Sequence, residues 1–244
     1  MRSDVDVSVP ARLIGEPARA AMLTALLSGQ ALAAGELARA AGVSAATASE
    51  HLGRLRDGGL VEVVAAGRHR YYRLASPEVA TAIEALATVS PSRPVRSLRQ
   101  SNTDAAMVLA RTCYDHLAGR LGVSVHDALV RAGHLAAGGD GYVLTDRGTQ
   151  GMTALGIDLV AAHTARRNFA MPCLDFTERR PHLAGALGAA ICRHALESGW
   201  VVRRAEGQRA LRLTDVGRDA LAAHLGVVVT GTGQVSVQTE TSAA

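Results

Sequence analysis

A duplication in the second half of the chain limits the folds open to this sequence. His116-Leu-Ala-Gly-Arg-Leu-Gly returns as His182-Leu-Ala-Gly-Ala-Leu-Gly. Farther along, Leu144-Thr-Asp-Arg-Gly returns as Leu213-Thr-Asp-Val-Gly. Self-similarity in one order is typical of a duplicated supersecondary unit whose copies bury their apolar faces together. Residues 104–225 are therefore predicted to form one block.

A polar segment precedes this block. Residues 91–103 contain two Pro, three Ser and three Arg but hardly any apolar side chain, which is typical of a linker between domains. A chain of 244 residues is long enough for two domains. We therefore predict a first domain at 1–90 and a second domain made of two copies, 104–162 and 163–225.

The last residues differ from both blocks. Residues 226–244 are rich in Thr, Gly, Ser and Gln and show no helical period or capping signal. Such a composition offers too little apolar surface to offset the entropy lost when a chain orders. A disordered tail is therefore predicted, with an added strand through Val227 to Val229 as the alternative.

Capping signals divide residues 1–90 into short elements. Pro17 is favourable in the first turn of a helix, and Gly29 ends that helix. Gly42 ends the next helix, and Ser44 caps the one after it. Apolar and alternating patterns predict helices at 17–28, 36–41, 45–57 and 77–89 and strands at 60–64 and 70–74. This order is a helix-turn-helix followed by a two-stranded wing and a closing helix.

The predicted helix at 45–57 has one apolar face and one slim polar face. Leu52 and Leu55 point inward. A helix enters the major groove of DNA when its outer face is slim and offers hydrogen-bonding groups to the base edges. The residues on the outer face are Thr47, Ser49, Glu50, His51 and Arg54.

The tip of the predicted wing, 64–73, is strongly basic. Gly67-Arg-His-Arg-Tyr-Tyr-Arg places three Arg, one His and two Tyr in seven residues. Arg side chains at such a tip neutralise phosphates or enter the minor groove. The alternative is a solvated charged hairpin without a DNA role.

Ordered motifs run through this first domain: Ile14-Gly-Glu-Pro-Ala-Arg, Gly35-Glu-Leu-Ala-Arg-Ala-Ala-Gly-Val-Ser, Ala48-Ser-Glu-His-Leu-Gly-Arg-Leu and Gly67-Arg-His-Arg-Tyr-Tyr-Arg-Leu. Together they resemble the ArsR/SmtB family of winged-helix repressors. The resemblance implies a homodimer that occupies a palindromic operator and leaves it when an effector binds. The DNA-binding candidates are Ser44, Thr47, Ser49, His51 and Arg54 on the helix and Arg68, His69 and Arg70 in the wing.

The metal-sensing members of that family differ from this sequence at both of their usual sites. Their thiolate site would need Cys around 36–41, and their interhelical zinc site would need Asp and His on the last helix. Residues 36–41 contain no Cys, and residues 77–89 contain no His or Cys. The effector is therefore expected to bind the second block.

Each copy in the second block also echoes the first domain. Glu36-Leu-Ala-Arg-Ala-Ala-Gly-Val-Ser aligns with His116-Leu-Ala-Gly-Arg-Leu-Gly-Val-Ser, and strand-like segments follow in both. We predict a mainly α chain with short β wings (α+β), in which a winged helix-turn-helix domain precedes two winged-helix-like repeats. A helix from Ser124 to Gly133 would be too short to read a groove, so the repeats are expected to have lost this role.

A set of Cys, Asp and His recurs between the copies, although the second His follows later than the first. If the copies pack about a pseudo-two-fold axis, the two sets converge on one site. Its thiolates, imidazoles and carboxylates would suit a borderline metal or a reactive electrophile. The alternative is that the Cys are small buried hydrophobes and the His and Asp bind helix ends. The effector candidates of this set are Cys113, Asp115, His116, Cys173, Asp175 and His182.

The second block also holds most of the aromatic residues of the chain. Tyr114, Phe176 and Trp200 lie beside or within the duplicated motifs. They are predicted to line a pocket for an apolar or planar effector, with core filling as the alternative. Both a metal ion and a small molecule stay open as the effector.

Charge and Cys content narrow the function classes. The 26 basic residues, all Arg, and 22 acidic residues give a net charge of +4, which permits a nucleic-acid partner without requiring one. Three Cys are too few for a disulfide framework, and no apolar run has the ~18 residues of a membrane span. We predict a cytoplasmic, ligand-responsive repressor with no membrane contact and no enzymatic role. The alternatives are a Cys/His-dependent enzyme and a non-regulatory DNA-associated interaction protein.

Overall fold

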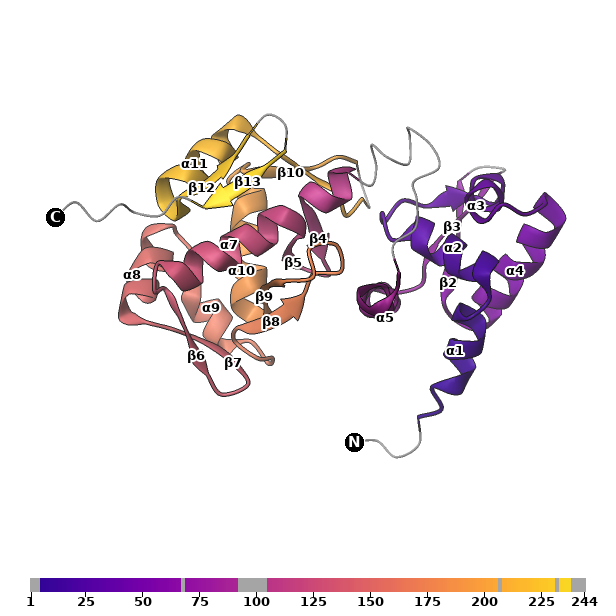
Figure 1. Cartoon of the computed structure of the whole chain (residues 1–244), viewed down its shortest axis with the longest axis horizontal. Coiled ribbons are helices and arrows are strands. Elements are labelled where there is room, and N and C mark those ends of the chain that lie inside the picture. The colour runs from indigo at the N-terminus through magenta and orange to yellow at the C-terminus, as the bar shows by residue number, and fades with distance from the viewer. Residues whose placement is uncertain (1–4, 67–68, 92–104, 206–207, 231–232, 238–244) are drawn as a thin grey trace. The chain divides into compact units, whose positions relative to one another are not determined.

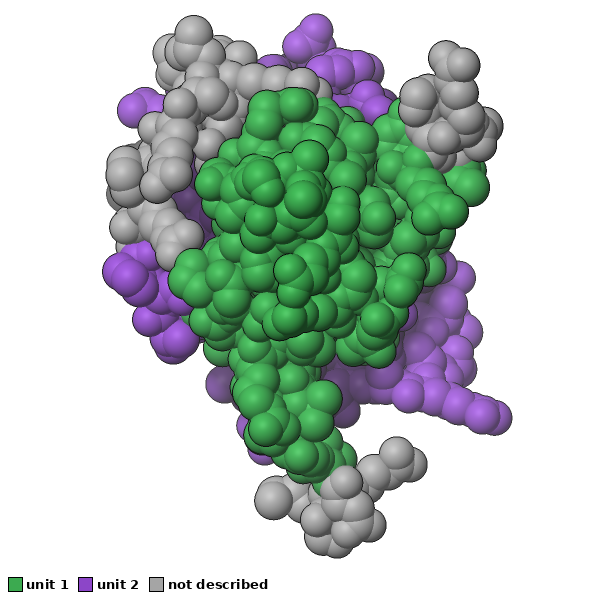
Figure 2. All heavy atoms as spheres, turned by 90° about the vertical axis from the view of Figure 1, so that its right-hand side faces the viewer, with its two compact units in different colours: residues 1–87, 207–209 green, residues 88–206, 210–244 purple. Residues whose placement is uncertain are grey.

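The structure, a computed structural model, describes residues 5–66, 69–91, 105–205, 208–230 and 233–237. In it the chain forms two compact units (Figure 1, Figure 2). Unit 1 comprises residues 1–87 with 207–209, and unit 2 comprises residues 88–206 with 210–244. Within the described residues, no helix has both the length and the apolar character needed to cross a membrane.

Unit 1 combines helices with a small antiparallel sheet. Its elements are α1 (Ser8–Ile14), α2 (Pro17–Leu26), β1 (Leu32–Ala33), α3 (Ala34–Ala41), α4 (Ala45–Asp57), β2 (Val61–Ala66), β3 (His69–Leu74) and α5 (Pro77–Val89). The strand order is β1-β3-β2, and β2 and β3 form a hairpin with Val61 opposite Leu74. Unit 1 is therefore a winged helix-turn-helix, as predicted.

Two residues set the turn between α3 and α4. Gly42 has a φ of 68°, in the left-handed region that glycine adopts without strain, and ends α3. Ser44 Oγ accepts a hydrogen bond from the Thr47 backbone N–H and so caps α4. The two helices then pack on a core that includes the fully buried side chains of Met22, Leu23, Leu37, Leu52 and Leu55.

The structure departs from the sequence prediction at the edges of unit 1. Helix α1 is absent from the prediction because none of its residues is buried, so its sequence carries no apolar period. The wing strands reach Ala66 and His69 and are longer than predicted. Gly67 and Arg68 lie outside the described residues. Helices α4 and α5 match their predicted ranges.

Unit 2 mixes short hairpins with helices. Its elements are β4 (Arg111–Cys113), β5 (His116–Ala118), α7 (Gly119–Arg131), β6 (Leu135–Gly138), β7 (Gly141–Leu144), α8 (Asp146–Ala154), α9 (Leu159–Thr164), β8 (Met171–Leu174), β9 (Pro181–Ala184), α10 (Gly185–Glu197), β10 (Val201–Arg203), β11 (Leu211–Leu213), α11 (Asp215–Leu225), β12 (Val227–Val229) and β13 (Val235–Val237). Each duplicated His-Leu-Ala-Gly motif marks the point where a hairpin runs directly into a long helix. Helices α7 and α10 lie in the middle of unit 2 (Figure 1), and α7 packs on β9 while α10 packs on β5.

The glycines of this motif allow a tight passage from strand to helix. Gly119 and Gly185, the first residues of α7 and α10, have φ of 75° and 83°. A Cβ at these positions would lie 2.6 and 2.7 Å from a backbone oxygen. One turn later, a Cβ on Gly122 or Gly188 would lie 2.3 Å from a backbone oxygen of the preceding strand. Part of the duplicated motif is therefore a packing requirement.

The two copies are not built like the first domain, which corrects the prediction of winged-helix-like repeats. The aligned segment 116–124 runs from β5 into α7, so Ser124 lies inside a helix and does not cap one. A two-residue turn with Tyr114 at φ 58° folds β4 back on β5, so residues 116–118 form a strand although they align with the start of the helix predicted at 36–41. Among the described residues, each copy has one long helix between two hairpins.

The prediction of a disordered tail fails for residues 227–230 and 233–237, where β12 matches the alternative of an added strand through Val227 to Val229, while residues 238–244 lie outside the described residues. Strands β12 and β13 pair as an antiparallel hairpin, with Val227 opposite Val237. Val227 is fully buried, Val229 is nearly so, and β12 packs against α11. The Val side chains of both strands supply apolar surface, since Val235 and Val237 also pack on the core of unit 2, and this burial offsets the ordering of the segment.

Candidate functional site

Helix α4 exposes a polar face on unit 1. Its apolar side is buried through Ala48, Leu52 and Leu55. Ser44 Oγ lies 2.8 Å from Thr47 Oγ1 at the start of the helix, so both hydroxyls are ordered at the surface. The exposed polar residues of this face are Ser44, Thr47, Ser49, Glu50 and Arg54.

His51 departs from the prediction that it lies on this outer face. Its side chain is 15% exposed, and its Nε2 lies 3.6 Å from Glu16 Oε2. Its Nδ1 lies 3.4 Å from the Arg19 guanidinium. The pKa of Glu16 is lowered, mainly by the hydrogen bond from the Arg19 backbone N–H. His51 therefore packs toward the start of α2, away from the exposed face.

The hairpin β2–β3 carries the basic wing residues. Arg70 is exposed in β3, and Arg73 forms an ion pair with Glu62 across the hairpin. Arg68 lies outside the described residues, and only the backbone of His69 is described. Arg70 is therefore the wing candidate whose exposed side chain the structure describes.

In unit 2, the hairpins β4–β5 and β8–β9 carry the duplicated Cys and His. Cys113 lies directly opposite His116, and Cys173 lies directly opposite His182. Directly opposed side chains project from the same face of a hairpin. Each hairpin thus offers one thiol beside one imidazole, and the longer connection between β8 and β9 accounts for the later position of His182.

The two Cys/His pairs meet in one cluster. One ligand atom from each of Cys113, His116, Cys173 and His182 lies within 4.8 Å of all the others. The Nε2 atoms of the two imidazoles are 3.1 Å apart. Cys173 is half-buried and the other three residues are buried. We call these four residues the Cys/His cluster.

A carboxylate lies behind each imidazole of the Cys/His cluster. Asp115 Oδ1 is 3.4 Å from His116 Nδ1, and Asp175 Oδ2 is 3.5 Å from His182 Nδ1. The Nε2 atoms face each other on the opposite side of the rings. Asp115 is within hydrogen-bonding distance of His116 Nδ1, whereas Asp175 faces His182 Nδ1 as a nearby negative charge. A negative charge on this side favours a proton on Nδ1, which leaves Nε2 as the ligand atom. The two Asp therefore support the cluster from behind and are not part of it.

Asp175 is held by a dense set of partners. It is fully buried, and its Oδ2 accepts hydrogen bonds from the Arg111 guanidinium at 2.9 Å and from the Gly119 N–H at 2.7 Å. Burial alone raises the pKa of the Asp175 carboxyl. The charge of Arg111 and the hydrogen bonds from Thr177 and Gly119 outweigh burial and hold the pKa well below its ordinary value. Asp175 is therefore a fixed anion.

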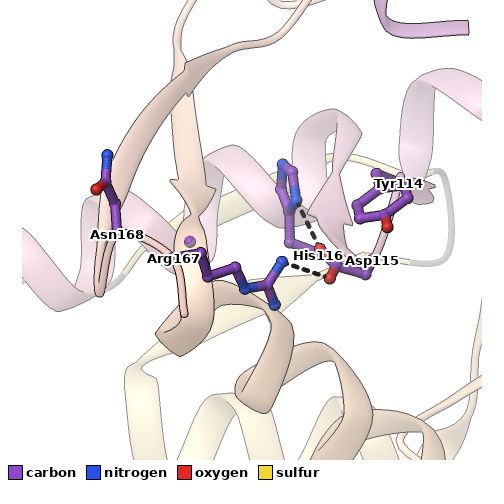
Figure 3. Close-up of a pocket in the computed structure, with 6 residues that line it drawn as sticks. Tyr114, Asp115, His116, Arg167 and Asn168 are labelled. Atoms are coloured by element: carbon purple, nitrogen blue, oxygen red, sulfur yellow. Dashed lines mark hydrogen bonds and ion pairs between the residues drawn. The ribbon is translucent and has the colours of Figure 1, made fainter. Parts of the chain in front are cut away.

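An open pocket of about 430 Å³ adjoins the other half of the Cys/His cluster (Figure 3). Figure 3 shows Asp115 between the imidazole of His116 and the guanidinium of Arg167. Arg167 Nη1 lies 2.7 Å from Asp115 Oδ2, and the two side chains are 39% and 35% exposed. The residues that line the pocket are Tyr114, Asp115, His116, Arg167, Asn168 and Gly185.

The three aromatic candidates do not share a pocket. Tyr114 is 57% exposed at the pocket beside His116. The Phe176 ring packs against Arg111, whose Cζ atom lies 4.2 Å from the centroid of the ring. Trp200 is buried in the hydrophobic core of unit 2. Core packing of Trp200 and the cation–π contact of Phe176 favour the core-filling alternative for these two residues, whereas Tyr114 lies at the pocket beside His116.

Sequence reasoning misses the two arginines that pair with the supporting carboxylates. Arg111 precedes Cys113 by two residues, but Met171 stands at the matching place before Cys173. The duplication therefore gives no signal for Arg111. Arg167 reaches Asp115 from a distant part of the chain, and no local pattern links them.

Comparison with known proteins identifies the family. Residues 14–64 match a protein family described as a helix-turn-helix domain. The chain is 41% identical over 217 residues to the uncharacterized HTH-type transcriptional regulator YdfF of Bacillus subtilis (strain 168). This match covers 89% of the chain and 96% of YdfF.

Solved structures match a smaller share of the chain. The transcriptional repressor BigR from Xylella fastidiosa is 29% identical, with a TM-score of 0.33, and the match covers 36% of this chain and 88% of BigR. The cadmium metal-sensor CMTR from Mycobacterium tuberculosis is 31% identical, with a TM-score of 0.31, and the match covers 38% of this chain and 100% of CMTR. The identification rests on the longer match to YdfF, on the matching family and on the winged helix-turn-helix of unit 1. From these we conclude that the chain belongs to the ArsR-type family of winged helix-turn-helix transcriptional regulators.

Proposed function

We propose that this protein is a cytoplasmic repressor that binds a palindromic operator as a homodimer and changes its affinity for DNA when unit 2 binds an effector. The observation that carries the DNA-binding part is the exposed polar face of α4. Helix α4 itself packs beside strand β2 of the wing. The membership in a family of transcriptional regulators supports the same function.

The exposed side chains of unit 1 divide into two roles. Thr47 and Ser49 have short hydroxyl side chains that suit hydrogen bonds to base edges in the major groove. Arg54 and Arg70 are exposed cations that suit phosphate contacts. Ser44 at the start of α4 is placed for a phosphate at the helix N-terminus. Arg68 and His69 belong to the proposal as wing residues, and His51 has the role of holding α4 against α2.

A second copy of the chain is the proposed partner of the exposed apolar residues of α1 and α5. Val9 in α1 is 49% exposed, and Leu86 and Val89 in α5 are 47% and 80% exposed. A dimer interface would cover such side chains. Leu86→Glu is expected to shift the protein from dimer to monomer in analytical ultracentrifugation, whereas a monomeric wild type would contradict this part of the proposal.

The DNA-binding part is tested on an operator selected from a random pool, with unrelated DNA as the reference. Thr47→Ala is expected to cost about 1 to 3 kcal/mol on the operator and little on unrelated DNA, as base contacts do. Arg70→Ala is expected to weaken binding to both and to lower the salt slope by roughly one to two per dimer, because each dimer loses two phosphate contacts.

Arg193→Ala is the matched control, because it removes an exposed positive charge from α10 in unit 2. It is expected to bind both DNAs like the wild type. Equal losses on both DNAs for Thr47→Ala and Arg70→Ala would contradict the division of roles. A wild-type protein with no preference for any selected sequence would favour the non-regulatory DNA-associated alternative.

A further inference from the structure

We propose that the Cys/His cluster binds one divalent ion of the zinc class and that this ion is the effector. Cys113 and Cys173 would bind it as thiolates, and His116 and His182 would bind it through Nε2. The assignment of a metal site stands on the geometry of unit 2 alone, whereas the assignment of the ion as effector rests on the proposed function.

The positions of the ligand atoms fit a single ion. Tetrahedral zinc has Zn–S distances of about 2.3 Å and Zn–N distances of about 2.0–2.1 Å, so its ligand atoms lie about 3.3–3.8 Å apart. In the cluster, the four ligand atoms lie within 4.8 Å of one another and the two Nε2 atoms are 3.1 Å apart. Contraction by about 1 Å between the most distant atoms brings all four ligands to bonding distance.

A carboxylate faces the Nδ1 side of both imidazoles. His116 and His182 each have a carboxylate oxygen 3.4 to 3.5 Å from Nδ1. Proteins commonly orient metal-binding histidines through such carboxylates, which also raise the basicity of the ligand nitrogen. Two rings from two separate hairpins share this arrangement, which a purely packing role for the histidines would not require.

The charges also balance at this buried position. Two thiolates and one divalent cation carry no net charge, and the two imidazoles are neutral. The supporting carboxylates Asp175 and Asp115 already have cationic partners in Arg111 and Arg167. Binding of the ion displaces one proton from each thiol into solvent, and the resulting neutral centre avoids the cost of burying a net charge.

The donor set selects the class of metal. Two sulfur and two nitrogen donors suit zinc and similar borderline ions, whereas magnesium and calcium require oxygen ligands. All four tetrahedral positions come from the protein, which is typical of structural sites and leaves no position for a substrate. The site therefore fits regulation or structural support and not metal-assisted hydrolysis.

The Cys/His cluster lies where a bound ion would contact both copies of the duplication in unit 2. Hairpins β4–β5 and β8–β9 belong to different copies of the duplication, and each packs on the long helix of the other copy. An ion bonded to both hairpins would fix the two copies against each other. A ligand changes a second equilibrium only when it binds two conformations with different affinities, and a cross-link of this kind provides such a difference.

The experiment uses reduced, chelator-treated full-length protein titrated with Co²⁺ and then with Zn²⁺, followed by absorption spectroscopy and native mass spectrometry. We expect one ion per chain, the intense d–d bands of tetrahedral cobalt, a thiolate-to-cobalt charge-transfer band, and displacement of Co²⁺ by Zn²⁺. In the double variant Cys113→Ser with Cys173→Ser, the charge-transfer band should vanish. The affinity for Zn²⁺ should fall by more than the roughly 100-fold that loss of a supporting group costs.

The chain contains its own control cysteine. Cys192 is buried in α10, burial raises its pKa to about 12, and it lies outside the Cys/His cluster. Cys192→Ala is therefore expected to bind Co²⁺ with the wild-type spectrum. Fluorescence of Trp200 in the core of unit 2 reports whether each variant is folded. If the double variant does not fold, His116→Gln serves as the second variant and should weaken Co²⁺ binding and alter its d–d bands.

Three results would overturn the metal site: a wild type that binds no Co²⁺, an octahedral cobalt spectrum without a thiolate band, or equal binding by wild type and a folded double variant. Operator binding by the metal-free and Zn²⁺-loaded forms then separates the two proposals. Zn²⁺ binding with unchanged operator affinity would overturn the effector assignment and leave the site intact. Failure of both forms to bind any operator would overturn the proposed function instead.

Discussion

The two hairpins of the Cys/His cluster carry the same pair of ligand residues, but the carboxylates that support their histidines lie in opposite surroundings. On β8–β9, the supporting carboxylate Asp175 is fully buried and bonded to a buried Arg111. On β4–β5, the supporting carboxylate Asp115 is 35% exposed and pairs with the partly exposed Arg167 beside an open pocket. The duplication thus preserves the ligands while their support differs.

The two halves are therefore expected to differ in how rigidly they hold the histidine and in how easily solvent reaches it. A buried, fully hydrogen-bonded carboxylate holds its histidine in one orientation before any ligand arrives, which lowers the cost of binding. An exposed ion pair is weak and opens readily to water. We therefore expect the β8–β9 half to fix the geometry and the β4–β5 half to be the route by which an ion exchanges with solvent.

The largest effect should come from Asp175→Asn in the buried half. The change removes the carboxylate charge that faces the Arg111 guanidinium, which is 1% exposed. Removal of one member of a buried ion pair costs about 3–5 kcal/mol. Urea unfolding followed by Trp200 fluorescence should show this loss in unit 2, whereas Asp115→Asn in the exposed half should cost no more than about 1 kcal/mol. Equal losses for the two variants would remove the difference between the halves.

The next largest effect is the increase in the free energy of unfolding when Zn²⁺ binds. A ligand that binds only the folded state stabilises it by about 2.7 kcal/mol at a free concentration of 100 times its Kd. Wild type and Cys192→Ala should both gain this increment in the Trp200 unfolding curve. Cys113→Ser with Cys173→Ser should gain nothing, and an increment of wild-type size in that double variant would show that Zn²⁺ stabilises the protein from another place.

A smaller effect is expected on the Zn²⁺ affinity of the protein when the supporting carboxylate of the exposed half is replaced. Asp115→Asn weakens the acceptor that orients His116, and loss of such a group typically costs 10- to 100-fold in metal affinity. Asp140→Asn, an exposed residue in the β6–β7 turn, is the matched control and should bind Zn²⁺ like the wild type. Wild-type affinity in Asp115→Asn would show that this carboxylate gives the ring no support.

The smallest equilibrium effect should come from Arg167→Ala. The ion pair with Asp115 is partly exposed, so its loss should change stability by less than about 1 kcal/mol. Because the pair lines the open pocket beside His116, its removal should speed the transfer of Zn²⁺ to a chelator. Stopped-flow transfer at the wild-type rate would place the exchange route elsewhere in unit 2.

The sequence predicts those parts of the molecule that local signals encode. Capping residues define α4 to the residue, because Ser44 and the glycines after Asp57 act over a few positions. The ArsR-type resemblance, drawn from ordered motifs, is confirmed by the long match to YdfF. The four cluster residues also stand out in the sequence, because duplication repeats them beside a recognisable glycine motif.

Contacts between distant segments explain the rest. Arg111 has no counterpart in the second copy and lies 64 residues from Asp175, so their ion pair becomes visible only in the folded unit. Val227 to Val229 read as part of a polar tail, yet their burial depends on a core built by other elements. Trp200 follows α10 and is buried in the core of unit 2. Its position beside a duplicated motif therefore reflects core packing.

The most direct test of the account is the affinity of the full-length protein for Zn²⁺, measured with and without saturating operator DNA. Binding equilibria are reciprocal, so an ion that alters operator affinity must have its own affinity altered by the same factor. We therefore expect saturating operator to change the Zn²⁺ affinity by roughly 5- to 150-fold, the usual range of such coupling. An unchanged Zn²⁺ affinity on the operator would contradict the account.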